Sequence, residues 1–516
     1  MTQAYLFARS AWLLISDMLG LLWYFLYGIV VLGLSVYGVH RLWMIITFVR
    51  CRNQKHKPLS TFDVLPQVTI QLPIYNEKYV IKRLLAAVCD LDYPIERFDI
   101  QVLDDSTDET CDIARQEVER LKKQGFQIEY IHRTNREGFK AGALQNGLDK
   151  ARGEFVAIFD ADFVPASNLL RKSVDYFTDE RIGMIQTRWG HINRGFSLLT
   201  RIQALLLDGH LLIEQTVRNR SGRFFNFNGT AGIWRKSTIL DAGGWEHDTL
   251  TEDLDLSYRA QMQGWRFVFL PEVITPAELP VDMNAFKTQQ HRWAKGAVQT
   301  CKKLLPRILS SELPLKIKLE AAFHLTSNFA YLLLAAMALL IIPDPKGNPD
   351  LVTLMCIHIP IFLLASFTVI LFYALVLWQV RIKWYLGMVY LPMLIAVGIG
   401  LSINNAKAVL EALFNMESPF SRTPKHGIES KKRPEALAVY FSQKSWLVVL
   451  EFLMFAHYVH YIFKAFDYGL WLSLPFFVLF CAGFGYTALM SIGANNWADW
   501  IFAKTRVKSL ITSHGI

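Results

Sequence analysis

Paired acidic residues follow two short apolar runs in the first third of the chain. Asp104 and Asp105 end one run, and Asp160 and Asp162 end another. Ligands of parallel sheets bind at the carboxyl ends of the strands, so these carboxylates are expected near one site. Hard divalent ions prefer oxygen ligands and bridge to phosphate oxygens. The D-x-D triplet therefore predicts a metal and diphosphate site, although such triplets also arise by chance in long chains.

A second set of reactive side chains lies between Thr251 and Trp293. Asp253 opens a predicted helix, where acidic residues are ordinary partners of the helix dipole. Its carboxylate would also serve as a general base if an acceptor hydroxyl came within hydrogen-bond reach. Gln289, Arg292 and Trp293 share one helical neighbourhood by their spacing. Arginine can hold a diphosphate with its planar fork, and tryptophan offers a sugar ring an apolar face.

The first predicted strand leads into Tyr75 and Glu77, which are placed to meet a nucleotide base. No G-x-G-x-x-G follows this strand, which argues against a dinucleotide-binding enzyme. Surface turns with Asn-Glu are also common, so this stretch is explained equally well as an ordinary turn. Further along, Asn228 to Gly232 form a small-residue loop whose glycines would let the backbone approach a ligand. The same loop is also explained as a turn between two elements.

The elements that must position these residues alternate between short strands and helices over about residues 64–277. This alternation predicts an α/β fold with a mostly parallel sheet covered on both faces. Asp104 would bind the base or ribose, with Ser106 capping the helix that follows. The predicted strands are 67–72 (ending at Pro73), 100–103, 128–131 and 155–159, and the predicted helices are 79–89, 108–123 and 139–151.

The bulk composition indicates a membrane protein. Of the 516 residues, 52% are hydrophobic and 19% are charged, and the net charge is +9. The basic residues cluster beside apolar segments, as in cytoplasmic loops of membrane proteins, so no nucleic-acid partner is expected. The six cysteines are scattered without a C-x-x-C pair, which supports neither a zinc site nor a disulfide framework. The apolar start lacks a clear signal-peptide cleavage site.

The apolar segments predict a multi-pass arrangement with the catalytic region in the cytoplasm. Basic residues follow segment 19–39, which places residue 50 onward inside. A basic amphipathic helix after Asp282 is expected in the membrane interface. Segment 384–403 contains Pro392 and is flanked by basic residues on both sides, so it is predicted to be interfacial or re-entrant. The other predicted spans are 320–342, 351–379, 445–466 and 470–493.

Six regions follow from these patterns. They are an N-terminal transmembrane helix and basic linker (1–58), a catalytic domain (59–280), amphipathic interface helices (281–319), a transmembrane hairpin with the interfacial segment (320–403), a cytoplasmic loop (404–444), and a C-terminal transmembrane hairpin with a short tail (445–516).

Taken in order, D-D, D-x-D, T-E-D and Q-x-x-R-W resemble the processive members of glycosyltransferase family 2, which include cellulose, chitin and hyaluronan synthases. The chain is most similar to the cellulose synthase-like A and C groups and to bacterial mannan and glucan synthases. The resemblance is dense over about residues 66–300 and loose in the membrane region. The motifs that carry it are QVLDDSTD (101–108), AIFDADF (157–163), FNFNGTAGIWR (225–235), AGGW (242–245), TEDLDLSYRA (251–260) and QQHRWAKG (289–296).

The resemblance implies a Rossmann-like GT-A catalytic domain joined to an α-helical transmembrane domain with interfacial helices. It implies a nucleotide-sugar donor and Mg²⁺ or Mn²⁺ as cofactor. By the match of motifs, Asp253 would be the base, with Glu252 beside it at the acceptor, and Trp293 would hold the acceptor sugar. The residues that would contact the nucleotide, diphosphate or metal are Tyr75, Glu77, Asp104, Lys140, Asp160, Asp162, Gln289 and Arg292, with Asp160 and Asp162 serving the metal.

The cytoplasmic loop contains Phe420-Ser421-Arg422-Thr423-Pro424-Lys425. This stretch is similar to the F-x-V-T gating loop of cellulose synthases, which covers the bound nucleotide. We assign Phe420, Arg422 and Thr423 to a gating loop on this basis. Arg422 stands where valine is usual and Pro424 follows the threonine, which sets the loop apart from that of cellulose synthase. Arg422 would add a phosphate contact.

The expected function is a membrane-embedded, inverting, processive β-glycosyltransferase. It would polymerise hexose from UDP-glucose or GDP-mannose into a β-glucan or β-mannan and move the chain through its own spans in the cell (inner) membrane. The expected partners are the donor, the growing polysaccharide and membrane lipids, and the sequence does not indicate an oligomeric state. One alternative is an enzyme that adds a single sugar to a lipid. Another is a transporter or scaffold with an inactive domain, against which the full set of carboxylates argues.

Overall fold

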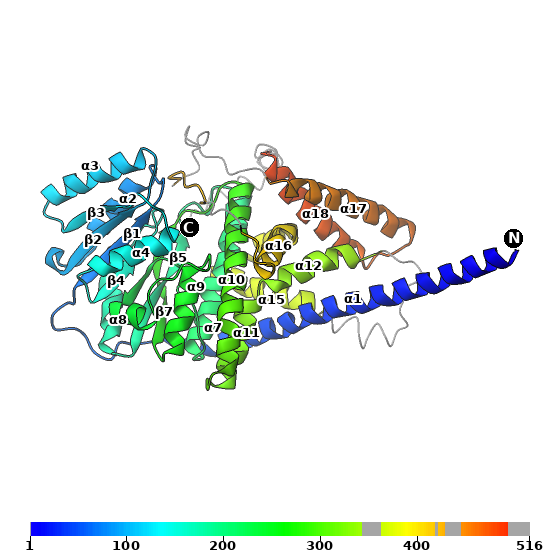
Figure 1. Cartoon of the computed structure of the whole chain (residues 1–516), viewed down its shortest axis with the longest axis horizontal. Coiled ribbons are helices and arrows are strands. Elements are labelled where there is room, and N and C mark those ends of the chain that lie inside the picture. The colour runs from blue at the N-terminus through cyan, green and yellow to red at the C-terminus, as the bar shows by residue number, and fades with distance from the viewer. Residues whose placement is uncertain (1, 343–362, 418–421, 429–444, 494–516) are drawn as a thin grey trace.

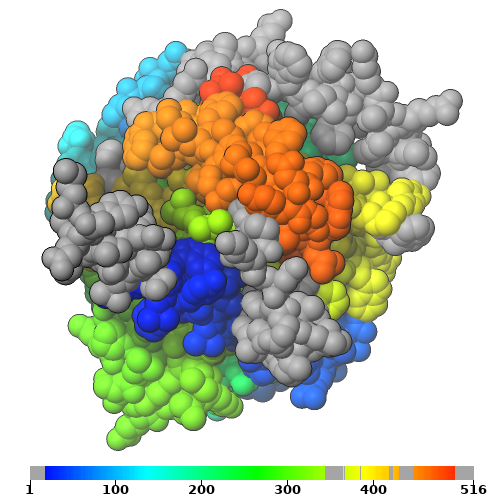
Figure 2. All heavy atoms as spheres, turned by 90° about the vertical axis from the view of Figure 1, so that its right-hand side faces the viewer, coloured from blue at the N-terminus to red at the C-terminus, as the bar shows by residue number. Residues whose placement is uncertain are grey.

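The protein divides into a sheet domain and a bundle of long apolar helices, as Figure 1 shows. We analysed a computed structural model that describes residues 2–342, 363–417, 422–428 and 445–493. Helix α1 (Thr2–Cys51) begins far from the sheet and runs toward it, so the N-terminus lies at the end of the molecule opposite the sheet domain. Figure 2 looks onto the helical end, where the pair α17 and α18 lies above α1 in that view.

The sheet has seven strands in the order β3-β2-β1-β4-β6-β5-β7. Every neighbouring pair is parallel except those of β6, which runs antiparallel to β4 and β5. The predicted mostly parallel α/β sheet is therefore confirmed. The strands are β1 (Val68–Ile74), β2 (Phe98–Asp104), β3 (Ile128–His132), β4 (Phe155–Ile158), β5 (Ile182–His191), β6 (Gly232–Arg235) and β7 (Arg266–Ala277).

Helices cover both faces of the sheet. One apolar core lies under α2 (Ile81–Cys89) and α3 (Thr110–Lys123), where Leu84, Val88 and Val118 pack on the strands. The second core lies under the helices on the other face, with Leu144, Ile239 and Leu256 as its central members. These helices are α4 (Phe139–Lys150), α8 (Lys236–Asp241) and α9 (Glu252–Met262). Burial on both faces explains why β2 is buried at every position.

Two local predictions at the carboxyl edge of the sheet are wrong. Strand β1 continues through Pro73, which pairs with Leu103, to Ile74. β4 pairs with β1 only as far as Gln71, so Pro73 has a neighbouring strand on one side only, where its missing N–H is tolerated. Ser106 does not cap α3, which begins four residues later at Thr110. Instead, the Ser106 hydroxyl accepts the Asn76 N–H at 2.7 Å and ties the loops after β1 and β2 together.

The register of the strands brings their polar ends to one edge. Ile74 lies opposite Asp104, which lies opposite His132, so the loops after β1, β2 and β3 emerge side by side. Because β6 is antiparallel, it begins where its neighbours end. Gly232 pairs with Ile158 at the end of β4, and the loop before β6 therefore reaches the same edge.

Helix α10 (Met283–Ser310) joins the sheet domain to the apolar helices. The Asp282 carboxylate caps its first turn by accepting the Ala285 N–H at 2.8 Å. Two buried lysines on α10 pair with carboxylates of the helical region. Lys287 meets Glu451 at 2.5 Å, and Lys295 meets Glu411 at 3.3 Å. These ion pairs fix the orientation of α10 relative to α16 and α17.

Four helices among the described residues are long and apolar enough to cross a membrane, or five if the bent pair α11–α12 is one span. The bend between α11 and α12 is 53°. The described helices of this half of the molecule are α11 (Leu315–Thr326), α12 (Phe329–Leu340), α15 (Thr368–Gln379), α16 (Trp384–Leu413), α17 (Leu447–Asp467) and α18 (Leu474–Ser491), with a π-helical turn at Leu363–Phe367.

Segment 384–403, which we predicted to be interfacial or re-entrant, is long and apolar enough to span, and its position in a membrane stays a prediction. It belongs to α16, a single helix of 30 residues that continues through Pro392 to Leu413 and meets the length and apolarity of a span. Packed neighbouring helices tolerate a proline in an apolar helix because they satisfy the freed backbone groups. The side of the membrane on which each loop lies stays a prediction.

The remaining described elements are short helices and turns between the strands. Ser197 and Thr200 form a capping box at the start of α6. The elements are the 3₁₀ turns Ile95–Arg97 and Val174–Thr178, α5 (Leu169–Ser173), α6 (Leu198–Asp208), the π-helical turn Gly209–Glu214 and α7 (Gln215–Arg220).

We predict that the buried pair Lys287–Glu451 is needed for stability. Lys287→Met leaves the fully buried Glu451 carboxylate without its cation and should lower the free energy of unfolding by about 3–5 kcal/mol. The double variant Lys287→Met/Glu451→Leu should recover most of that loss. Denaturant unfolding in detergent would measure both. The exposed Lys316→Met is the control and should stay within about 0.5 kcal/mol of the wild type. A Lys287→Met variant as stable as this control would contradict the prediction.

Candidate active site

One cleft of about 210 Å³ opens at the carboxyl edge of the sheet and is walled by α10 on its far side. It collects residues from the loops after β1 and β4, the loop before β6, the first turn of α9, and the segment 422–428. The predicted site residues that line it are Tyr75, Glu77, Lys140, Asp160, Asp162, Glu252, Asp253, Gln289, Arg292, Trp293, Arg422 and Thr423. The convergence of the D-x-D, T-E-D and Q-x-x-R-W motifs is therefore present, while the role of each residue stays a proposal.

Backbone strain concentrates around this cleft. Asn76, Phe139 and Ala231 have positive φ angles of 54°, 49° and 54°, although none is a glycine. Asn76 lies between two cleft residues, Phe139 directly precedes Lys140, and Ala231 ends the small-residue loop. Non-glycine residues in this conformation persist only where the surrounding structure holds them, and they cluster at functional sites.

Asp253 lies at the start of α9, facing the small-residue loop. Burial, with the neighbouring Glu252 carboxylate, raises the pKa of Asp253 to about 7, against the opposing effect of Lys140. Its Oδ1 also accepts the Leu254 N–H at 2.8 Å. Gly229 packs directly on this carboxylate: a Cβ there would lie 3.0 Å from the Asp253 Oδ2. A carboxylate with a pKa near 7 in a cleft is suited to accept a proton at neutral pH.

The two D-x-D carboxylates point into the cleft, and each is neutralised by a lysine ammonium. Lys140 Nζ lies 2.5 Å from Asp160 Oδ1 and also donates to the Gly229 carbonyl at 2.8 Å. Lys425 Nζ donates to Asp162 Oδ2 at 2.7 Å. Although burial opposes it, the surrounding carboxylates raise the pKa of Lys140, and Asp162 does the same for Lys425.

These contacts fit a divalent cation. Two carboxylates that attract cations in the structure itself offer the hard oxygen ligands that Mg²⁺ and Mn²⁺ take. Two carboxylates alone do not fill the coordination shell of such an ion, so phosphate oxygens of a donor would complete it. Asp160 and Asp162 would hold the ion, and the ion would neutralise the charge of a diphosphate.

Glu77 is enclosed beneath segment 422–428. Burial and the nearby acidic residues raise the pKa of Glu77 to about 8, although Arg422 acts in the opposite direction. Its Oε1 lies 3.6 Å from Arg422 Nε, while its Oε2 has no hydrogen-bond partner among the described residues. A carboxyl group that stays protonated near pH 7 can donate a hydrogen bond to a ligand.

The structure places Asp104 apart from the other predicted nucleotide contacts, and its contact with the nucleotide stays a prediction. Asp104 is fully buried and does not line the cleft, whereas its neighbour Asp105 does. The Tyr130 hydroxyl donates to Asp104 Oδ2 at 2.7 Å, and the Ser106 N–H donates to Oδ1 at 3.0 Å. Asp105 pairs instead with Arg133 at the cleft wall. Asp104 therefore supports the loop and Asp105 presents the carboxylate.

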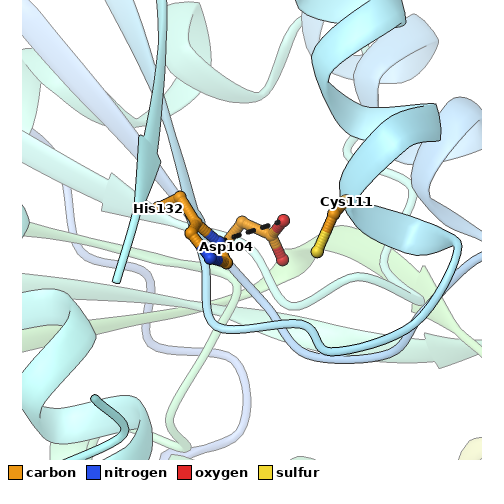
Figure 3. A group of neighbouring side chains, drawn as sticks. All are labelled: Asp104, Cys111 and His132. Atoms are coloured by element: carbon orange, nitrogen blue, oxygen red, sulfur yellow. Dashed lines mark ion pairs between the residues drawn. The ribbon is translucent and has the colours of Figure 1, made fainter. Parts of the chain in front are cut away.

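Asp104, Cys111 and His132 lie close together, as Figure 3 shows, and their side chains also contact other groups of the protein. The Cys111 thiol donates to the Ser106 carbonyl at 3.0 Å, and burial raises the pKa of this thiol. A protonated thiol is a poor metal ligand. His132 Nδ1 lies 3.9 Å from Asp104 Oδ2. A second acidic group, Glu246, Asp248 and Asp255, already surrounds the ammonium of Lys303.

Aromatic side chains line one side of the cleft. The rings of Trp293 and Trp189 lie 6.5 Å apart at 52°, and Phe163 packs edge-on against Trp189 at 5.2 Å. At the other end, the Arg136 guanidinium lies 3.3 Å from the centre of the Tyr75 ring. Flat aromatic surfaces of this kind suit a sugar ring or a nucleotide base.

Sequence reasoning missed several of these residues. Trp189, Arg136 and Glu278 were not singled out, and Lys425 was noted only as part of the gating-like stretch. Trp189 lies in β5, a strand that the sequence analysis did not predict and that carries no recognisable motif, so only the fold brings it to Trp293. Phe420, the third predicted gating residue, lies outside the described residues.

We predict that Gly229 is needed for the close packing on Asp253. Gly229→Ala should destabilise the protein more than Gly222→Ala, because both glycines have a positive φ but only Gly229 meets neighbouring atoms. The backbone term is about 1–2 kcal/mol for each variant. The clash should add roughly 1 kcal/mol or more for Gly229→Ala. Thermal unfolding of the two variants would compare them, and equal losses would show that the loop does not rest on Asp253.

Known proteins similar to this chain include a glycosyltransferase family and plant mannosyltransferases. Residues 66–296 match the model described as "Glycosyltransferase like family 2". Glucomannan 4-beta-mannosyltransferase 1 of Cyamopsis tetragonoloba is 42% identical over 271 residues, covering 52% of this chain and 51% of the relative. The enzyme of the same name from Oryza sativa subsp. japonica is 39% identical over 312 residues, covering 58% and 59%.

The chain thus spans about half the length of the curated relatives it matches. Among solved structures, mannosyltransferase PcManGT from Pyrobaculum calidifontis, in complex with GDP-Man and Mn²⁺, has a TM-score of 0.52 and 20% identity. That likeness covers 76% of this chain and all of the other, and it confirms the GT-A fold. Residues 66–296 of this chain are therefore similar to glycosyltransferase family 2.

Proposed function

We propose that this protein is a membrane-bound, inverting hexosyltransferase that builds a β-linked polysaccharide from a nucleotide sugar. The observation that carries the proposal is the single cleft in which Asp160, Asp162, Asp253, Arg292 and Trp293 meet. The D-x-D pair faces the place where a diphosphate would bind, the base lies across the cleft, and an aromatic ring forms the acceptor wall. Few other reactions need this combination.

The transfer is a single displacement. Asp253 accepts the proton of an acceptor hydroxyl as that oxygen attacks the anomeric carbon of the donor sugar. The bond from the anomeric carbon to the phosphate oxygen breaks on the opposite face, so an α-linked donor gives a β-linkage. Arg292 and Gln289 hold the departing diphosphate. A divalent cation held by Asp160 and Asp162 supplies charge neutralisation to the leaving group.

The relatives favour a mannosyl donor. Both are glucomannan 4-beta-mannosyltransferases, and the similarity extends over 271 and 312 residues. We therefore propose GDP-mannose as the donor and a β-mannan or glucomannan as the product, with UDP-glucose as the competing donor. Tyr75 and Arg136 supply the flat and cationic surfaces that a nucleotide base would stack on.

Elongation, rather than a single addition to a lipid, is supported by the acceptor wall. Trp293 and Trp189 present two rings along one side of the cleft, which suits a sugar chain better than a lipid tail. Helix α10 carries Trp293 and is anchored by ion pairs to α16 and α17, so Trp293 lies on the helix that joins the cleft to the apolar helices. We propose that the polymer crosses the membrane there and that the sheet domain is cytoplasmic.

We predict that protein in lipid nanodiscs, with Mn²⁺, releases GDP from GDP-mannose and forms products longer than one added mannose. Asp253→Asn should reduce GDP release at least about 100-fold because it removes the proton acceptor, while donor binding persists. Asp241→Asn, at an exposed carboxylate on α8, is the matched control and should keep full activity. Wild-type turnover by Asp253→Asn would overturn the assignment of the base. A product limited to one added sugar would overturn elongation, and turnover of UDP-glucose alone would overturn the donor.

A further inference from the structure

Segment 422–428 lies across the side of the cleft where we propose that the donor binds. It is held there by hydrogen bonds to Glu278, more than 140 residues away in sequence. At its start, the Arg422 guanidinium donates to the carbonyl oxygens of Tyr75 and Asn76, which form the turn after β1. Arg422 and Lys425 line the cleft together with Glu77 and Asp162. The segment thus covers the place where we propose that the nucleotide binds.

One carboxylate anchors the end of this segment. The side chain of Glu278 is only 1% exposed, and its two oxygens accept three consecutive backbone N–H groups. The His426 N–H bonds to Oε1 at 2.9 Å, and those of Gly427 and Ile428 bond to Oε2 at 3.0 and 3.2 Å. Successive N–H groups that converge in this way form an anion-binding concavity.

The geometry of Gly427 makes the concavity possible. Its φ is +69°, and a Cβ at this position would lie 3.1 Å from the Tyr79 carbonyl oxygen. A side chain here would meet both backbone strain and the loop after β1. Glu278 directly follows β7, and its own N–H donates to Asp162 Oδ2 at 3.2 Å. The anchor of the segment and the second carboxylate of the D-x-D motif are therefore in direct contact.

Docking of the segment places an ammonium group at that carboxylate. Lys425 Nζ lies 2.7 Å from Asp162 Oδ2 and donates to the Glu278 carbonyl at 2.9 Å. Asp162 is 8% exposed and Lys425 is 11% exposed in this pair. An ammonium and a metal ion cannot both occupy the region next to the same carboxylate oxygen.

We propose that Glu278 is a positioning residue that docks segment 422–428 over the cleft, and that docked Lys425 occupies the place of the divalent cation at Asp162. Docking and binding of a free cation then exclude each other. The inference rests on the proposed function, since it takes Asp162 as a cation ligand of the transferase.

Linkage gives this exclusion a measurable consequence. If docking weakens cation binding by some factor, cation binding must weaken docking by the same factor. In the absence of donor, the Lys425 ammonium neutralises the charge of the Asp162 carboxylate and lowers its affinity for a free metal ion. A cation therefore binds well only when the segment releases Asp162.

Two measurements on the full chain in lipid nanodiscs test the proposal, with Mn²⁺ alone as the probe. Hydrogen exchange of the backbone amides of residues 426–428 reports docking. Electron paramagnetic resonance of free Mn²⁺ reports cation affinity. The variants are Glu278→Gln, with exposed Glu272→Gln on β7 as its control, and Lys425→Gln, with exposed Lys172→Gln as its control.

Glu278→Gln should speed exchange of the amides of 426–428 by about tenfold or more, because a neutral amide holds them less strongly than a carboxylate. Glu272→Gln should leave this exchange unchanged. Lys425→Gln should tighten Mn²⁺ binding by about five- to tenfold, and Lys172→Gln should not. In wild-type protein, Mn²⁺ should speed exchange at 426–428, and this effect should be absent in Lys425→Gln.

Equal exchange in wild type and Glu278→Gln would overturn the anchor. Equal Mn²⁺ affinity in wild type and Lys425→Gln would overturn the competition, and this second test stands even if Glu278→Gln fails to fold. Neither measurement uses a sugar donor. If both expected results appear while no nucleotide sugar is turned over, the docking of segment 422–428 and its competition with the cation are confirmed, and the proposed function is wrong.

Discussion

The cleft encloses more acidic than basic side chains, and this excess of negative charge is the main constraint on its structure. Seven carboxylates and five lysine or arginine side chains line it. Burying a charge without a partner is costly, so the excess must be neutralised by protonation or by a bound cation. Burial, together with neighbouring carboxylates, raises the pKa of Glu77 to about 8 and that of Asp253 to about 7, which favours protonation of both groups. A divalent cation at Asp160 and Asp162 would be the other response, and the two lysines at these carboxylates show how strongly the site attracts positive charge.

Two parts of the chain build this cleft, the sheet domain and the bundle of apolar helices. The sheet domain folds around two apolar cores and presents strand ends, whereas the apolar helices pack beside it and hold α10 in place. Buried ion pairs at Lys287 and Lys295 anchor α10, so the wall that carries Arg292 and Trp293 is as fixed as the sheet edge opposite it. A transferase needs donor and acceptor held in one geometry, and the anchored α10 wall would help to provide it.

Much of this arrangement could be predicted from the sequence, because strand ends and motif order are local signals. The alternation of strands and helices gave the sheet, and the order of the acidic motifs gave the convergence of Asp160, Asp162 and Asp253. That Asp105 rather than Asp104 lines the cleft could not be predicted, because successive residues of a strand face opposite sides and the phase depends on the final register. The continuity of α16 through Pro392 depends on packed neighbours. The contact of Lys425 with Asp162 joins residues 263 apart and has no local signal.

In the proposed mechanism Asp253 acts as the base, and burial raises its pKa. The pH dependence of kcat/KM for sugar transfer in nanodiscs tests this most directly. Below its pKa Asp253 is protonated and cannot accept a proton, so kcat/KM should fall tenfold per pH unit below about pH 7 and reach a plateau above it. A constant kcat/KM from about pH 5 to 8, as expected for a carboxylate with its ordinary pKa of about 4, would contradict the account.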